Sequence, residues 1–181
     1  LGVYDQVVWN TLHGRPFFYT ATGQPLLHLS NHASPILLLI APLYLIYSGP
    51  QTLLVAQAAA VGLGGLPLFW FARERLAPRQ GILVGLSLLS AYLLFPPLQV
   101  VTLSDFHPPA LAVAFLSFAF YGVLRRRAGL ALVAAILAMA CKEQIPLVVV
   151  TLGLYALLIQ RTWRLGLAVI GLGAGWCVAV M

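Results

Sequence analysis

Long hydrophobic stretches separated by short polar breaks dominate the sequence after residue 50. Six such stretches follow one another, at residues 51–72, 80–96, 110–124, 128–141, 144–159 and 165–181. They do not alternate apolar and polar residues, as transmembrane β-strands do. Several approach the roughly 17–25 residues that a helix needs to cross a bilayer. The pattern predicts an all-α, polytopic membrane protein, with a transmembrane bundle of about six spans in residues 51–181.

The first 50 residues form the longest segment that carries polar side chains. Residues 3–13 are predicted to form a short amphipathic helix, in which Asp5, Trp9 and His13 share one face. Gly14-Arg15-Pro16 ends this helix. Residues 35–47 are apolar but too short to span and contain Pro42, which is typical of an interfacial helix. We therefore expect residues 1–50 to be an outer, periplasmic loop with juxtamembrane helices.

The composition excludes a soluble domain. Hydrophobic residues make up 61% of the chain and charged residues 8%, and the mean hydropathy is +0.96, whereas soluble domains have about 25% charged residues. The net charge of +6 does not indicate nucleic-acid binding, because the basic residues lie in short breaks between apolar stretches. Since the chain starts at Leu1 and stops at Met181 inside an apolar stretch, we expect a piece of a longer protein, truncated at both ends.

Arginines mark one side of the predicted bundle. Cytoplasmic loops are enriched in Lys and Arg, and eight arginines fall in three breaks, at positions 73, 75, 79, 125, 126, 127, 161 and 164. The intervening breaks, which contain Asp105, His107, Lys142 and Glu143, then face outward together with the first segment. Titratable groups at a membrane edge commonly have a task or a partner.

Simpler readings of these polar residues stay open. Asp105 could cap the next helix, with proline just inside it, and Lys142 could form an interfacial ion pair with Glu143. His28 and His32 have the i, i+4 spacing that permits metal binding, but two histidines alone are a weak signal. The two cysteines, Cys141 and Cys177, lie in apolar stretches and are read as packing residues.

The order of four motifs resembles an uncharacterised family of bacterial predicted membrane proteins in the GT-C glycosyltransferase superfamily. These motifs cover essentially the whole chain and comprise Tyr4-Asp5-Gln6 with Trp9-Asn10 and His13-Gly14, then Asn31-His32-Ala33-Ser34-Pro35, Asp105-Phe106-His107-Pro108 and Lys142-Glu143-Gln144. The resemblance implies a GT-C-like helical bundle in the bacterial cytoplasmic (inner) membrane. It also implies transfer of a sugar from a polyprenyl-phosphate donor on the outer face.

The resemblance implies a role for each motif. Asp5 matches the acid of the first outer loop and would act as general base, and Asp105 matches a second-loop acid. Lys142, Glu143, Arg15 and His32 are assigned to substrate binding, with Lys142 or Arg15 facing the departing phosphate. A divalent metal such as Mg²⁺ or Mn²⁺ is an open option, with Asp105 and His107 as its candidate ligands.

Two other classes of function compete with this prediction. A lipid or solute transporter would carry charged residues deep within its spans and paired discontinuous helices, whereas here the charges lie at the ends of spans. A non-catalytic subunit of a larger membrane complex could keep a GT-C-like fold without activity. The expected partners are membrane lipids, a polyprenyl-phosphate-linked sugar and, in this last reading, other subunits of the complex.

Overall fold

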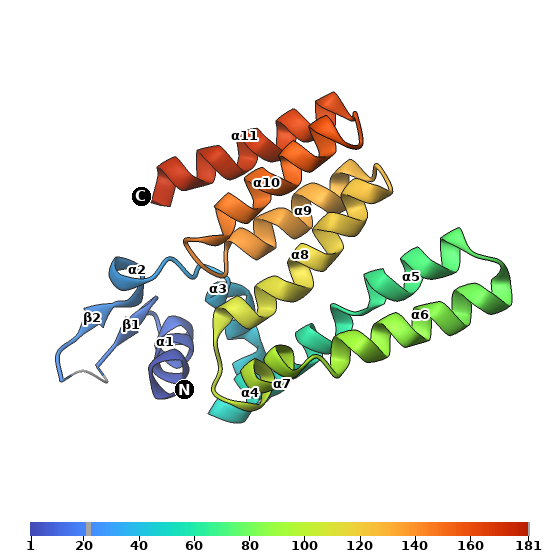
Figure 1. Ribbon diagram of the computed structural model, residues 1–181. Helices are drawn as coiled ribbons and strands as arrows, with labels where there is room; N and C mark the ends of the chain where they lie inside the picture. Colours follow the sequence, from blue (N-terminus) through green and yellow to red (C-terminus); the bar gives the residue numbers. More distant parts are fainter. Residues whose placement is uncertain (21–22, 181) are drawn as a thin grey trace.

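The computed structural model describes residues 1–20 and 23–180, and Asn31 by its backbone alone. The protein is helical apart from one small hairpin, which confirms the predicted fold class (Figure 1). Its elements in chain order are α1 (Gly2–Leu12), β1 (Phe18–Tyr19), β2 (Leu26–Leu27), α2 (His28–Asn31), α3 (Leu37–Ile40), the 3₁₀ helix η1 (Ala41–Leu45), α4 (Pro50–Leu63), α5 (Leu66–Arg75), α6 (Pro78–Leu93), α7 (Pro96–Leu103), α8 (Pro108–Leu124), α9 (Ala128–Met139), α10 (Ile145–Leu158) and α11 (Trp163–Val180).

The elements from α1 to η1 form an N-terminal unit at one side of the molecule (Figure 1). The predicted helix at residues 3–13 is confirmed as α1, and Gly14 follows it with a φ of 77°. In the antiparallel hairpin Phe18 lies opposite Leu27 and Tyr19 opposite Leu26. Side chains of α1 fasten the hairpin, since the Asn10 amide donates to the Phe18 carbonyl at 2.9 Å. The apolar residues 35–47 form the short helical turns α3 and η1.

The six apolar stretches are all helical, but two differ from the predicted pattern. The first is divided at Gly64 and Gly65 into α4 and α5. The second does not stop at the Pro96-Pro97 pair; the chain bends by 53° and continues as α7 to Leu103. Both breaks have a proline at the first or second position of the following helix, where its missing N–H would have no intrahelical partner.

By length and composition, two helical stretches among the described residues could cross a membrane, Pro50–Arg75 and Trp163–Val180. The bent pair α6 and α7 would make a third if it is one span. The helices α8, α9 and α10 are apolar but shorter, with 17, 12 and 14 residues. The six-span topology therefore stays a prediction.

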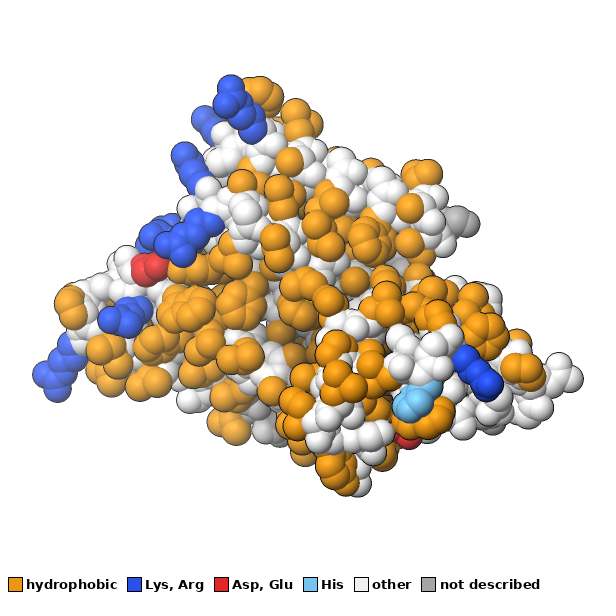
Figure 2. Space-filling model, turned by 180° about the vertical axis from the view of Figure 1, so that it is seen from behind, with side chains coloured by type: hydrophobic (Ala, Val, Ile, Leu, Met, Phe, Trp, Pro, Cys, Tyr) orange, Lys and Arg blue, Asp and Glu red, His pale blue; other side chains and the backbone are white. Residues whose placement is uncertain are grey.

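The eight arginines in the breaks between helices lie away from the N-terminal unit, whereas Arg15 belongs to that unit. The α5–α6, α8–α9 and α10–α11 turns lie on the side away from that unit (Figure 1). Seen from behind, Lys and Arg side chains gather along the edge formed by these turns (Figure 2). Hydrophobic side chains cover most of the rest of the visible face. We call the side of these turns the arginine end and the opposite side the polar end. At the arginine end Glu74 joins two turns, because its carboxylate lies 3.0 Å from Arg125 Nε and accepts the Tyr121 hydroxyl at 2.8 Å.

Small residues let the paired helices approach closely. A Cβ added at Gly122 of α8 would lie 2.6 Å from the Ala131 backbone nitrogen of α9. Near this contact the two helices contribute Ala119, Val123, Ala135 and other residues to one buried hydrophobic cluster. Close contact through small residues is the usual way in which helices associate inside a bilayer, where lipid competes equally for apolar side chains.

We predict that Gly122→Ala destabilises the α8–α9 pair, because its methyl group would collide with backbone that cannot rotate away. The free energy of unfolding should fall by roughly 1–3 kcal/mol, measured from thermal or denaturant unfolding in detergent. Gly129→Ala is the matched control, since nothing lies within 4 Å of a Cβ added in that position on α9. Equal melting temperatures for the two variants would show that the close approach is not a constraint.

Candidate functional site

The N-terminal unit docks on the bundle through the segment that follows α2. The Ser34 hydroxyl donates to the Cys141 carbonyl at 3.0 Å, and the Ile36 N–H donates to the Ala140 carbonyl at 2.9 Å. Ser34 is buried, with 1% of its surface exposed. Ala140 is the C-cap of α9, so these bonds satisfy carbonyls at a helix end that has no intrahelical donor left. They also bring His32 beside the α9–α10 turn.

His32, Lys142 and Glu143 form one cluster at this seam. The Lys142 ammonium donates to His32 Nδ1 at 3.0 Å and lies 3.1 Å from Glu143 Oε1. His32 Nδ1 lies 3.4 Å from the same carboxylate oxygen. Burial acts to raise the pKa of Glu143, but hydrogen bonds from the backbone and from Lys142, together with the positive charge of Lys142, hold that pKa below its usual value. The second oxygen, Glu143 Oε2, is buried without a hydrogen-bond partner in the described part of the chain.

A small polar cavity of about 280 Å³ adjoins this cluster. Its lining comes from the start of α1, from β1 and from α2, and consists of Leu1, Val3, Tyr4, Tyr19, His28 and His32. His28 is 2% exposed, and its Nε2 is buried with no partner among the described residues. Burial lowers the pKa of His28, as do the nearby His32 and Lys142. At neutral pH the imidazole is therefore uncharged.

Tyr4 lies at the centre of this region. Its ring meets those of His28 and Phe106 edge-on, both at 5.4 Å between centroids, and lies 6.4 Å from that of His107. Burial raises the pKa of Tyr4, and the charges of Asp105 and Glu143 raise it further. The phenol thus stays protonated and connects the histidine side of the cavity with the α7–α8 turn.

Asp105 and His107 occupy the α7–α8 turn, which is held by Gln57 of α4. Gln57 is 0% exposed. Its amide nitrogen donates to the Val101 carbonyl at 3.2 Å and the Asp105 carbonyl at 3.3 Å. Its amide oxygen accepts the His107 backbone N–H at 2.8 Å. One buried amide thereby satisfies three backbone groups of a turn that carries two predicted site residues.

The possible capping role of Asp105 is wrong. The N-cap of α8 is His107, and its side chain makes no capping bond. Asp105 instead accepts the N–H of the next residue, Phe106, at 2.9 Å and contacts the backbone nitrogen of Leu1. Pro108 and Pro109, the first two residues of α8, have no N–H that needs an acceptor, and the Ala110 N–H donates to the His107 carbonyl at 2.9 Å, so no capping carboxylate is required.

The metal assignment to Asp105 and His107 stays a prediction. His107 Nδ1 lies 3.0 Å from the Asp105 carbonyl oxygen. Among residues 1–20 and 23–180, no group of three or more His, Cys, Asp or Glu side chains could hold a metal ion. The pair would therefore need ligands from substrate or water to complete a coordination sphere.

Asp5 lies on the side of α1 that faces η1. Its Oδ1 accepts the Tyr44 hydroxyl at 2.6 Å, and burial together with this hydrogen bond raises the pKa of Tyr44. Trp9 and His13 stack on each other farther along α1, at 3.8 Å between centroids. Asp5 does not line the cavity beside His28, so the predicted base and the His32–Lys142–Glu143 cluster occupy neighbouring sides of α1.

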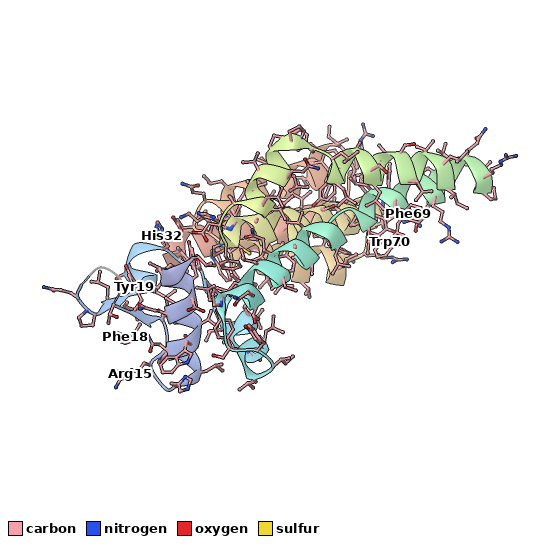
Figure 3. All side chains as sticks on the ribbon, turned by 90° about the horizontal axis from the view of Figure 1, so that it is seen from below. Arg15, Phe18, Tyr19, His32, Phe69 and Trp70 are labelled. Atoms are coloured by element: carbon pink, nitrogen blue, oxygen red, sulfur yellow. The ribbon has the colours of Figure 1, made fainter. Side chains whose placement is uncertain are left out.

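Arg15 stands apart from the other predicted site residues. It is exposed and borders a separate hollow with Trp9, Phe18 and Pro25. Figure 3 shows Arg15 and His32 at opposite ends of the N-terminal unit. The structure therefore brings three of the four predicted substrate-binding residues together and leaves Arg15 elsewhere.

Three organising residues were not singled out in the sequence, namely Gln57, Tyr4 and Tyr44. Gln57 carried a signal, because an amide in the middle of an apolar stretch needs hydrogen-bond partners. Tyr4 belonged to a quoted motif, but it was not given a role. Tyr44 had no distinguishing local pattern, since its partner Asp5 is 39 residues away.

The comparisons with known proteins give one match. Residues 1–181 match the family described as "Predicted membrane protein (DUF2079)". No curated protein and no solved structure matches the chain.

We predict that Gln57→Leu frees the α7–α8 turn, because it leaves the His107 N–H and the Asp105 carbonyl without their buried partner. The His107 amide should then exchange with deuterium faster, in hydrogen-exchange measurements on the protein in lipid nanodiscs. Gln51→Leu is the control, because Gln51 is exposed on the same helix. Unchanged exchange at His107 in Gln57→Leu would refute this role of the amide.

Proposed function

The chain belongs to the DUF2079 family of predicted membrane proteins, and from this premise we propose that it is part of a multi-pass glycosyltransferase of the bacterial inner membrane. The enzyme is of GT-C type and moves a sugar from a polyprenyl-phosphate donor at the outer face. Residues 1–50 form the outer loop over the reaction site, and the apolar helices hold the lipid.

One arrangement carries the proposal. At the end away from the arginine turns, a carboxylate, a lysine and a polar cavity lie over the ends of apolar helices, which is where a lipid-linked polar substrate would present its head. Asp5 is oriented by Tyr44 through Oδ1, and within the described residues no hydrogen bond engages Oδ2. Lys142 lies at the α9–α10 turn, in contact with His32 and Glu143.

The proposed sugar transfer assigns a step to Asp5 and a step to Lys142. Asp5 Oδ2 accepts the proton of an acceptor hydroxyl, and the resulting oxygen forms a bond to the anomeric carbon of the sugar. The bond between that carbon and the phosphate oxygen breaks, and polyprenyl phosphate leaves with the electron pair. Lys142 exchanges its contact with Glu143 for the departing phosphate and stabilises its charge.

An apolar groove beside η1 could hold the hydrocarbon chain of the donor lipid. The groove is about 450 Å³ and lies between η1 and α4, with Leu43, Ile46 and Val55 among its lining residues. Leu43 precedes Tyr44, the residue that holds Asp5. A polyprenyl chain in this groove would reach the membrane edge near the carboxylate.

The outer placement of the N-terminal unit has its own test. We expect a cysteine replacing Ser48 to react with a membrane-impermeant thiol reagent added to intact cells, because residues 1–50 lie outside in the proposed topology. A cysteine replacing Ala77, in the α5–α6 turn, should react only after the membrane is permeabilised. The reverse pattern would overturn the orientation and, with it, the outer active site.

We predict that Asp5→Asn in the full-length protein lowers sugar transfer by about 10²–10⁴-fold, the usual contribution of a general base. The change removes the charge and almost no volume. The measurement is release of radiolabelled mannose, glucose or arabinose from the corresponding undecaprenyl-phosphate donor in proteoliposomes.

Lys142→Met separates binding from chemistry in the same assay. It should raise the KM for the donor more than Asp105→Asn does, because Lys142 faces the phosphate. Transfer by the Asp5→Asn protein at the wild-type rate would remove Asp5 from the mechanism. Absence of transfer by the wild-type protein with every donor would favour a non-catalytic subunit or a transporter.

A further inference from the structure

The cavity beside His28 is not used by the mechanism above. It measures about 280 Å³ and is separate from the η1–α4 groove, with which it shares no lining residue. Protein interiors seldom leave polar atoms unpaired, because an unsatisfied buried group destabilises the folded state. Two such atoms, His28 Nε2 and Glu143 Oε2, occur in or beside this region of the described structure.

The imidazole of His28 is surrounded by the cavity's own aromatic lining. Tyr4, Tyr19 and His32 lie 5.4, 6.2 and 6.0 Å from its centroid. The side chain is 98% buried, since 2% is exposed. A buried, unpartnered donor-acceptor group among the rings that line a cavity is the feature expected of a ligand site rather than of a packing defect.

The charges around the cavity exclude a simple anion site. Lys142 does not line the cavity and is paired with Glu143 at 3.1 Å, and Asp105 adds a negative charge close enough to raise the pKa of Tyr4. Burial, with His32 and Lys142, keeps the pKa of His28 low and its ring neutral. The groups offered to a ligand are thus neutral hydrogen-bonding groups and aromatic surfaces.

From this geometry we propose that the cavity lined by Tyr4, His28 and His32 binds a neutral, hydroxyl-bearing ring, namely a monosaccharide unit. Ring faces pack against the tyrosines, one hydroxyl pairs with His28 Nε2 and another donates to Glu143 Oε2 after a small shift of the side chains. Its identification as the transferred sugar rests on the proposed function, whereas the binding of a monosaccharide does not.

A cysteine at the cavity wall reports occupancy without any need for transfer. Val3 lines the cavity and is half-buried, so Val3→Cys is placed in the full-length protein in nanodiscs, in a Cys177→Ala background. Cys141 is kept because it is buried. The rate of reaction with a small neutral maleimide is measured alone and with methyl glucoside, methyl mannoside or inorganic phosphate. Gln24→Cys, at an exposed position in the hairpin, is the control for effects on the reagent.

Methyl glycosides should slow labelling of the Val3→Cys protein several-fold and saturably, and should leave the Gln24→Cys protein unchanged. Phosphate should have no effect. His28→Leu should abolish the protection, and His28→Gln, which keeps an amide near the position of Nε2, should retain part of it. Tyr4→Phe, which removes one hydroxyl and keeps the ring, should weaken the protection without unfolding the protein.

Two results would overturn the proposal. Protection by phosphate equal to that by the glycosides would make the cavity an anion site, and no protection by any glycoside would leave it a structural void. The experiments also distinguish failure of the monosaccharide site from failure of the proposed glycosyltransferase activity. Protection without sugar transfer would keep the monosaccharide site and reject the glycosyltransferase, and transfer without protection would do the reverse.

Discussion

Pairing of buried backbone groups at helix ends is the constraint on which the polar end of this protein depends. The last carbonyls of a helix have no donor within it, and near a membrane water cannot be relied on to supply one. At the end of α9, Ala140 and Cys141 receive theirs from Ile36 and Ser34, more than 100 residues earlier in the chain. The same contact that satisfies these carbonyls sets His32 against Lys142 and Glu143. The geometry of the cluster is thus a consequence of how a helix end is completed.

Gln57 solves the equivalent problem at the α7–α8 turn by a different route. There a single buried amide supplies both donors and an acceptor. A neutral amide is suited to this position because it can pair with N–H and carbonyl groups together. A charged side chain would have to be desolvated in the same place. The side chains of Asp105 and His107 are therefore not needed to cap a helix. At the polar end, Asp105 is half-buried and His107 is exposed.

The sequence predicted the parts of this architecture that depend on local patterns. Apolar runs located all six helical stretches, and the Arg-containing breaks located the turns at the arginine end. Where the chain breaks inside a run, at Gly64-Gly65 or before α7, hydropathy carried no signal, because apolar residues flank the break on both sides. The site was predictable only in its residue types. That Lys142, Glu143 and His32 meet while Arg15 does not depends on how the N-terminal unit docks, and docking is set by long-range bonds such as Ser34 to Cys141. Family resemblance pointed to the motif residues, but the partners that orient them, Tyr44 and Gln57, lie outside the quoted motifs.

The neighbouring residues Tyr4 and Asp5 lie on two sides of α1 and contact different parts of the protein. Successive residues of an α-helix are rotated by about 100°, so Tyr4 meets His28 and Phe106 while Asp5 meets Tyr44 of η1. One side of α1 therefore adjoins a cavity with neutral hydrogen-bonding groups, and the other contacts η1, which together with α4 lines an apolar groove. A substrate with a hydroxyl-rich head and a hydrocarbon tail needs both environments within a short distance, with a carboxylate at the junction. In the proposed mechanism α1 carries that carboxylate between the cavity and η1, which is the reason for placing the proposed reaction at the start of this helix.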